Sequence, residues 1–269
     1  MAALDDKQLM ELVVVASAIL DDASSVFTSG RRAPQAVRKG DRDFATEIDL
    51  SLEREITAAL IAQTGIGVHG EEFGGQSISE GLVWVLDPVD GTLNYSAGLP
   101  YAAILLALLD DGIPVAGLTW LPIFGERMTA TAGGPVLRNG LALPALSKRS
   151  LANSIIGVGS FNLASTRGFT GQYRLDVIGE ISRQSSRIRM LGATGADFAY
   201  VATGALGGAL SFGHHVWDHA AGAALVAAAG GEVTDLSGRP WTVHSRSMLA
   251  AAPGVHAELL DVIHSVTAA

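Results

Sequence analysis

Cysteine is absent from this chain of 269 residues. Its absence excludes disulfide bonds, zinc sites built on thiolates and a cysteine nucleophile, and it is compatible with the reducing cytosol. Basic residues are scarce as well: 18 Lys and Arg stand against 27 Asp and Glu, which gives a formal net charge of −9. Because nucleic acids and anionic membranes are bound by basic surfaces, we expect neither a nucleic-acid polymer nor a membrane as a partner.

Long hydrophobic runs are also missing, since no segment approaches the ~18 consecutive apolar residues that cross a bilayer. The short apolar run 12–15 follows Asp5 and Asp6 without a basic region, which predicts an amphipathic helix and not a signal peptide. We therefore expect a cytoplasmic protein. With 48% hydrophobic and 17% charged residues, the chain has enough apolar side chains for a substantial core.

Two halves of different pattern meet near residues 145–151, which are polar and follow a proline. The first half, 1–145, predicts two amphipathic helices and then a largely antiparallel sheet, with a hairpin turn at Asp111 and Gly112. The second half, 146–269, alternates predicted strands with helices, as layered α/β structures do.

Two features of the first half bear on function. The segment 31–43 is basic, polar and interrupted by Pro34 and Gly40, so it predicts a mobile loop or a loose hairpin. The second predicted helix, over about 46–63, carries an apolar stripe at helical spacing, and its acids Asp49 and Glu53 lie off that stripe.

The segment 82–92, with the sequence LVWVLDPVDGT, organises the rest of the chain. Its unbroken apolar start predicts a strand buried on both faces, and Pro88 predicts the end of the strand because it donates no backbone hydrogen bond. Gly91 permits a sharp turn, and Thr92 is predicted to open a short helix. The string is good turn chemistry in its own right. It would also suit a cation and an anionic group together.

Four acids follow core elements of the predicted fold: Glu71, Asp87, Asp90 and Asp218. Each has an ordinary structural role open to it, as a turn residue, a loop charge or a helix cap. If they converge, like charges ~4 Å apart repel by ~4 kcal/mol at an effective dielectric of ~20, so the acids must bind protons or cations. Oxygen ligands without sulfur favour Mg²⁺ or Mn²⁺ over zinc.

Three other site classes fit less well. Adjacent histidines in a strand point in opposite directions, so His214 and His215 make a poor zinc site. Aspartyl-phosphate phosphatases of the haloacid dehalogenase type need aspartates one residue apart, whereas Asp87 and Asp90 are separated by a proline and a valine. A phosphate-loop string is lacking, and the glycine-containing segment 157–162 lacks the third glycine of a dinucleotide fingerprint.

The string DPVDGT at 87–92 and the string WDHAAG at 217–222 resemble the two signatures of the inositol monophosphatase family. Further segments match in the family's order and cover nearly the whole chain: 39–49 resembles its lysine loop and Thr-Glu-x-Asp segment, 70–72 its Gly-Glu-Glu, and 202–204 and 230–231 also fall where the family has them.

This resemblance implies a fold class, α/β (α+β), in which the two halves form a layered αβαβα sandwich. It implies a Mg²⁺-dependent, lithium-sensitive phosphoric monoester hydrolase that acts on a small phosphorylated polyol, inositol 1-phosphate first, and forms a homodimer. Two or three Mg²⁺ ions are expected, with Mn²⁺ as a substitute. The implied metal ligands are Glu71, Asp87, the carbonyl of Val89, Asp90 and Asp218.

The same resemblance assigns catalytic roles to Glu71, Thr92 and Asp90, with Glu71 and Thr92 orienting the attacking water. The N–H groups of Gly91 and Thr92 would hold the phosphate. The implied substrate contacts are Asp90, Gly91, Thr92, Thr194, Ser211 and Asp218, and the implied supporting residues are Lys39 and Asp49.

Substrate choice departs from the family pattern at two positions. Inositol-preferring members carry a glutamate where this chain has Ser211, and many members carry alanine where it has Thr194. A short, uncharged serine cannot grip a diol with two oxygens. Histidinol phosphate, fructose 1,6-bisphosphate and adenosine 3′,5′-bisphosphate therefore remain alternative substrates, and a phosphate-ligand sensor remains the alternative without catalysis.

Overall fold

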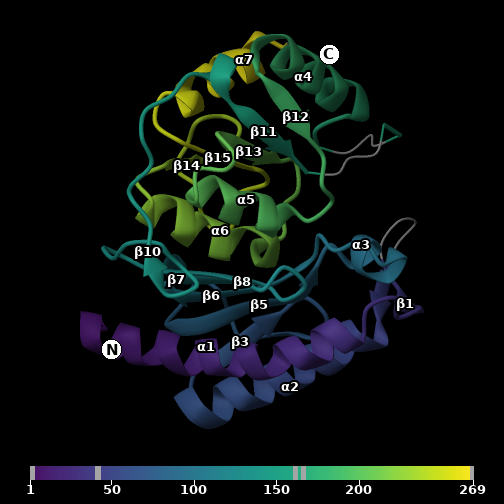
Figure 1. Cartoon of the computed structure of the whole chain (residues 1–269), viewed down its shortest axis with the longest axis vertical. Helices are drawn as coiled ribbons and strands as arrows, with labels where there is room; N and C mark the ends of the chain where they lie inside the picture. The colour runs from purple at the N-terminus through teal and green to yellow at the C-terminus, as the bar shows by residue number, and fades with distance from the viewer. Residues whose placement is uncertain (1–3, 40–43, 160–162, 165–167, 267–269) are drawn as a thin grey trace.

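Five layers build the fold in the computed structural model, which describes residues 4–39, 44–159, 163–164 and 168–266. From bottom to top in Figure 1 the layers are α1 (Asp6–Ser29) with α2 (Glu47–Thr64), an eight-stranded sheet, α5 (Thr194–Ala202) with α6 (Val216–Ala228), a five-stranded sheet, and α4 (Gly171–Gln184) with α7 (Val255–Ser265). The predicted αβαβα sandwich is confirmed.

The eight-stranded sheet belongs to the first half of the chain and is antiparallel except where β3 runs parallel to β5. In spatial order its strands are β10 (Leu141–Ala142), β9 (Leu137–Arg138), β8 (Glu126–Thr131), β7 (Ile113–Leu121), β6 (Ala103–Asp110), β5 (Leu82–Asp90), β3 (Gly67–Gly70) and β4 (Gly74–Gly75). A two-stranded hairpin, β1 (Gln35–Arg38) with β2 (Phe44–Thr46), stands apart from it, and α3 (Thr92–Ala97) follows β5 directly.

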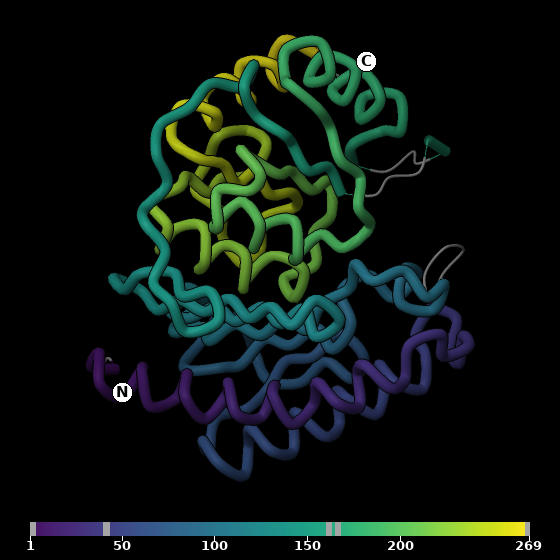
Figure 2. The backbone as a smooth tube through the Cα atoms, viewed as in Figure 1, coloured from purple at the N-terminus to yellow at the C-terminus, as the bar shows by residue number. Residues whose placement is uncertain are grey.

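The five-stranded sheet and the four helices around it come from the second half, as the colour change from teal to yellow in Figure 2 shows. A short 3₁₀ helix, Leu151–Asn153, leads into this sheet. Its spatial order is β12 (Arg187–Arg189), β11 (Ile155–Val158), β13 (Gly208–Ser211), β15 (Met248–Ala251) and β14 (Glu232–Thr234). The first three strands are parallel, and β15 is antiparallel to both of its neighbours.

Local sequence explains the two outer helices below the sheet. Helix α1 begins with a capping box between Asp5 and Gln8, and α2 begins with one between Thr46 and Asp49. The apolar stripe of α2 is fully buried. Gly65, with φ of 69°, ends α2 in the left-handed conformation that glycine adopts without steric cost.

Helix α6 lies very close to the eight-stranded sheet because its residues are small. A Cβ atom added at Gly117 of β7 would lie only 2.4 Å from the carbonyl oxygen of Ala221 in α6. A Cβ added at Gly222 would lie 2.4 Å from the Cβ of Phe198 in α5. The middle helical layer is thus packed tightly against the sheet and within itself.

The predicted end of the strand at Pro88 was wrong. Strand β5 does not end at Pro88 but runs on to Asp90, with an irregularity in its register against β6 between Asp87 and Asp90. Proline is tolerated at such a bulge because no ladder donor is required there.

The expected loose hairpin at 31–43 is confirmed in part by the pairing of β1 with β2, whereas residues 40–43 lie outside the described residues, as do 160–162 of the glycine-containing segment. None of the helices in the described ranges is long and apolar enough to cross a membrane. The division of the chain into 1–145 and 146–269 stays a prediction.

Candidate active site

The end of β5 carries two buried acids. Asp87 is 2% exposed, and its Oδ1 accepts a hydrogen bond from the backbone N–H of Val89 over 3.0 Å. The parallel strand β3 runs alongside, and the N–H of Glu71, just past its end, donates to the carbonyl of Leu86 over 3.1 Å. The carboxyl ends of two parallel strands therefore bring Glu71 beside Asp87.

Asp90 joins the first half of the chain to the second. Its Oδ2 accepts a hydrogen bond of 2.8 Å from the N–H of Ala196 at the start of α5, so a carboxylate from β5 caps a helix from the other half. Burial raises the pKa of Asp90 to about 7, although N–H groups at the start of α5 act in the opposite direction. Asp218 lies in the first turn of α6.

The four predicted acids interact electrostatically. Burial raises the pKa of Asp87 well above its ordinary value, and three nearby carboxylates raise it further: Glu71, Asp90 and Asp218. Carboxylates raise one another's pKa values when too little positive charge lies among them to offset their repulsion. The convergence of the acids is the central feature of the site.

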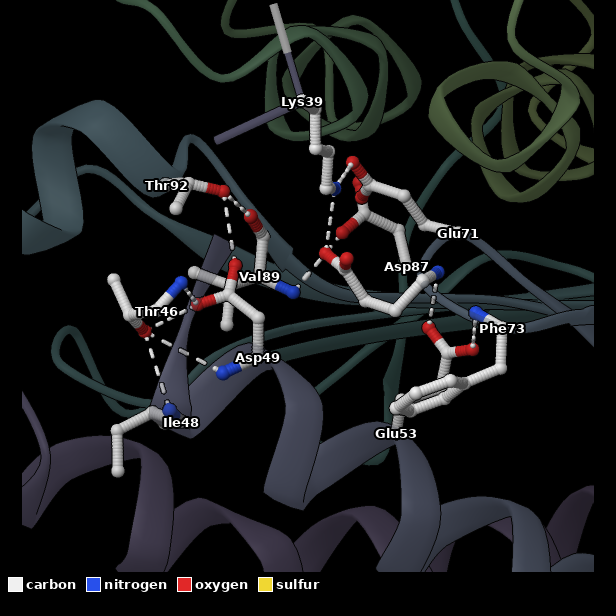
Figure 3. Close-up of polar contacts among 11 residues, drawn as sticks. Lys39, Thr46, Ile48, Asp49, Glu53, Glu71, Phe73, Asp87, Val89 and Thr92 are labelled. Atoms are coloured by element: carbon white, nitrogen blue, oxygen red, sulfur yellow. Dashed lines mark hydrogen bonds and ion pairs between the residues drawn. The ribbon is translucent and has the colours of Figure 1, made fainter. Parts of the chain in front are cut away.

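Lys39 supplies part of that positive charge. Figure 3 shows its ammonium reaching down from the hairpin, with Nζ 2.7 Å from Oε1 of Glu71 and 2.6 Å from Oε1 of Glu72. Burial lowers the pKa of Lys39, but the two glutamates outweigh burial and raise it above its ordinary value. Burial is likewise the main reason that the pKa of Glu72 rises to about 7.

Thr92 and Asp49 form a second polar group beside the acids (Figure 3). The Thr92 hydroxyl lies 3.1 Å from Oδ1 of Asp49 and 3.0 Å from the carbonyl oxygen of Val89, to either of which it can donate. Asp49 also accepts hydrogen bonds from the N–H and the hydroxyl of Thr46. Burial raises the pKa of Asp49. Asp49 is therefore in hydrogen-bond contact with Thr92, and its supporting role in the reaction stays a prediction.

Glu53 is a residue whose role the sequence reading missed. Its carboxylate accepts hydrogen bonds from the N–H groups of Glu72 and Phe73, over 2.8 and 2.9 Å, and the residue is 2% exposed. Glu53 thus fixes the backbone that follows Glu71. Asp49 and Glu53 lie off the apolar stripe but are buried. Their spacing of four residues places both on one face of the helix, and this spacing was the available signal that they act together.

The predicted substrate residues Thr194 and Ser211 both lie close to Gly159. A Cβ added at Gly159 would be 3.3 Å from the Thr194 hydroxyl and 3.7 Å from the Cα of Ser211. Ser211 is buried, and its hydroxyl accepts a hydrogen bond from the N–H of Gly213 over 3.1 Å. Gly91 turns the chain with φ of 86° at the start of α3, as predicted.

The two adjacent histidines differ from the expectation. His214 and His215 do not lie in a strand, and their rings are side by side with centroids 4.4 Å apart. The rule of alternating directions therefore does not apply to them. The ring of His215 also lies 4.8 Å from that of Trp217, so this ring belongs to an aromatic stack.

The donor set suits a hard cation, since the acids and the Val89 carbonyl offer oxygen atoms only. Within the described ranges, no group of three or more His, Asp or Glu side chains stands ready to hold a metal ion. The ammonium of Lys39 instead engages Glu71 and Glu72. The oxygen donors fit Mg²⁺ in kind, and Glu71 already interacts with Asp87.

Comparison with known proteins agrees with this geometry. The model of the inositol monophosphatase family matches residues 5–268. The chain belongs to this family. Inositol-1-monophosphatase ImpA of Mycolicibacterium smegmatis is 60% identical over 262 residues, which cover 97% of this chain and 95% of that protein. Fructose-1,6-bisphosphatase/inositol-1-monophosphatase of Thermotoga maritima is 29% identical and covers 85% of this chain and 86% of that protein.

A solved structure confirms the fold of this family member. The Thermotoga maritima IMPase structure matches with a TM-score of 0.83 and 26% identity, covering 97% of this chain and 98% of the other. The family and the fold class predicted from the two signature strings are therefore both correct.

Proposed function

We propose that this protein is a Mg²⁺-dependent phosphatase that hydrolyses inositol 1-phosphate to inositol and phosphate. The observation that carries the proposal is the convergence of Glu71, Asp87, Asp90 and Asp218 at the ends of β3 and β5 and the start of α6. The close relationship to an inositol-1-monophosphatase, over nearly the whole chain, supports the choice of substrate.

The metal ions would be held by Glu71, Asp87, the carbonyl of Val89, Asp90 and Asp218. When bound, Mg²⁺ lowers the pKa of the attacking water and stabilises the negative charge of the leaving alkoxide. Family membership implies metal dependence, and we propose two or three ions, replaceable by Mn²⁺ and displaced in part by Li⁺.

The chain's own groups then position the reactants. The Thr92 hydroxyl donates to Asp49 or Val89, so its lone pairs are free to accept a hydrogen bond from the attacking water. Glu71 would take the proton of that water, and Glu53 fixes the backbone that follows Glu71. The N–H groups of Gly91 and Thr92 would hold the phosphate. No covalent phosphoenzyme is required.

Ser211 makes the substrate range broader than inositol phosphate alone. Its hydroxyl already accepts a bond from Gly213 and cannot offer the two carboxylate oxygens that hold a diol. Histidinol phosphate, fructose 1,6-bisphosphate and adenosine 3′,5′-bisphosphate are the alternative substrates. The name of the Thermotoga relative joins the second of these with inositol phosphate.

The test is phosphate release from these four substrates, with Mg²⁺ and with a chelator. Release that needs the metal and is fastest with inositol 1-phosphate is the expected result. A different ranking would indicate that Ser211 has changed which substrate the protein prefers. Absence of release with every metal and substrate would leave a phosphate-ligand sensor as the function.

We also propose a cytoplasmic homodimer. The chain has a mass of 27.8 kDa, so light scattering after gel filtration should give twice that value. A monomer at micromolar concentration would contradict the dimer without affecting the proposed chemistry.

A further inference from the structure

A cavity of about 1050 Å³ opens at one edge of the five-stranded sheet. Phe212 and His214, which line it, follow the end of β13, and residues 245–247, just ahead of the antiparallel β15, line it from the same edge. Asp235, at the end of β14, also reaches this edge. The carboxyl ends of parallel strands are where ligands of such sheets bind.

A short segment of the chain connects the cavity to the proposed active site. The segment 212–215 joins Ser211, a proposed substrate contact, to α6, which carries Asp218. Phe212 packs with the apolar side chains of α4 and α7 and is 5% exposed. The segment 212–215 therefore links the cavity to the proposed active site.

The cavity is basic in a chain whose net charge is −9. Its charged lining consists of three arginines and one acid, together with two histidines: Arg174, Arg239, Arg246, Asp235, His214 and His244. Asp235 is already neutralised, because Oδ2 accepts from Nε and a terminal nitrogen of Arg239 over 3.0 and 2.8 Å. Its other oxygen accepts from Ser237 and from the N–H of Arg239.

Arg174 is held in position by a backbone carbonyl and an aromatic ring. Its Nε donates to the carbonyl of Phe169 over 2.9 Å, and its guanidinium lies 5.2 Å from the centre of the Phe212 ring. Burial lowers the pKa of Arg174, and no carboxylate in the described part of the chain pairs with it or with Arg246. Two guanidinium groups thus face the cavity with hydrogen-bond donors unused by acids.

We propose that this cavity binds a phosphate-type dianion between Arg174 and Arg246. Guanidinium groups present paired N–H donors that match phosphate oxygens, and a partly buried site strengthens the attraction. The dianion is either a separate phosphate compound or the second phosphate of a bisphosphorylated substrate. The second case rests on the proposed function, whereas the first does not.

Binding is tested with inorganic phosphate and the full chain in a chelating buffer, because the metal-free acids at the active site repel anions. Calorimetry should show one phosphate bound. Arg174→Gln combined with Arg246→Gln should weaken it at least about tenfold, which is about 1.4 kcal/mol. Arg187→Gln is the matched control, since Arg187 is exposed and its guanidinium bonds to the carbonyl of the neighbouring Ser186. It should bind phosphate as the wild type does.

Arg246→Gln alone guards against misfolding, because this side chain is exposed and its loss disturbs no packing. It should weaken phosphate binding while the thermal unfolding midpoint stays constant. No binding by the wild type, or equal binding by wild type and double variant, would overturn the proposal.

Kinetics distinguish the two sources of the dianion. If the second phosphate of a substrate binds here, the double variant lowers the ratio of kcat/KM for fructose 1,6-bisphosphate to that for inositol 1-phosphate about tenfold. If a separate compound binds, this ratio stays constant while the variant still loses phosphate binding. The protein could show no phosphatase activity and still bind phosphate through these arginines. That result would refute the proposed function and leave the assignment of the cavity standing.

Discussion

The negative charge of Asp90 serves the proposed chemistry, whereas its hydrogen bond to Ala196 stabilises the fold. Asp90→Asn keeps a side-chain oxygen that can accept from Ala196 but removes the negative charge. We expect phosphate release to fall by more than about a hundredfold, beyond the loss typical of residues that only support a metal ligand. Release assays with Mg²⁺, combined with circular dichroism, measure the two effects separately.

Asp261→Asn, on the outer helix α7, is the control for this change and should keep full activity. Turnover near that of the wild type in Asp90→Asn would refute the metal site as assigned.

Asp197 is a buried acid that gives stability a specific pH dependence. It accepts a hydrogen bond from the Tyr101 hydroxyl over 2.7 Å, and its Oδ2 has no partner among the described residues. Burial raises the pKa of Asp197 to about 7. Between its ordinary pKa and this value the folded state binds more protons than the unfolded state, so its contribution to stability falls as the pH rises.

Asp197→Asn removes this dependence while keeping an acceptor for Tyr101. The free energy of unfolding of the variant, relative to the wild type, should therefore rise between pH 4 and pH 8, by up to about 4 kcal/mol. Urea unfolding at both pH values measures it. A constant difference between the two proteins would show that Asp197 titrates normally.

At the scale of elements, the hairpin of β1 and β2 carries a cation into the acids. Lys39 competes with metal ions for Glu71, since its ammonium lies 2.7 Å from that carboxylate. Lys39→Gln should lower the Mg²⁺ concentration at half-saturation by roughly tenfold or more, because a charge ~4 Å away contributes a few kcal/mol at an effective dielectric of ~20. It should also lower the thermal unfolding midpoint of the metal-free protein.

Isothermal titration with Mg²⁺ and thermal melts in chelator test both effects, with Lys7→Gln on the exposed face of α1 as the control. If Lys39→Gln bound Mg²⁺ no more tightly than the wild type, Lys39 would not act as the competing cation.

Element by element, the sequence predicted what local chemistry determines. The apolar run after Asp5 and Asp6 located α1, and the apolar stripe at helical spacing located α2. Gly91 and Thr92 located α3, and the apolar run of 82–86 located β5. The continuation of β5 through Pro88 was missed because it depends on β6 alongside, which tolerates an irregular register there. The burial of Glu53 was missed for a similar reason: its partners, Glu72 and Phe73, are distant in sequence.

Across the whole molecule, the acids could be named from the sequence but their mutual arrangement could not. Asp90 of one half caps α5 of the other, and Lys39 meets Glu71 across 32 residues. Such contacts follow from the packing of layers and not from the spacing of residues. The signature strings pointed to the site because they resemble those of a known family, whereas no such string identifies the basic cavity.

The tight middle layer makes a prediction for the molecule as a whole. A methyl group added at Gly117 would meet the Ala221 carbonyl oxygen at 2.4 Å, so Gly117→Ala must shift α6 away from the sheet. We expect it to lower the free energy of unfolding by about 1–3 kcal/mol, the cost typical of overpacking. Gly179→Ala in α4 is the control, since its added Cβ would meet no atom within 4 Å.

The same packing decides whether the two halves unfold together. Trp84 and Trp120 report on the first half, and Trp217 and Trp241 on the second. Because α6 is wedged against β7, and Asp90 binds α5, tryptophan fluorescence and circular dichroism should give one coincident urea transition, which Gly117→Ala moves as a unit. Two separate transitions would mean instead that 1–145 and 146–269 unfold independently, and that the packing of α6 against β7 does not couple them.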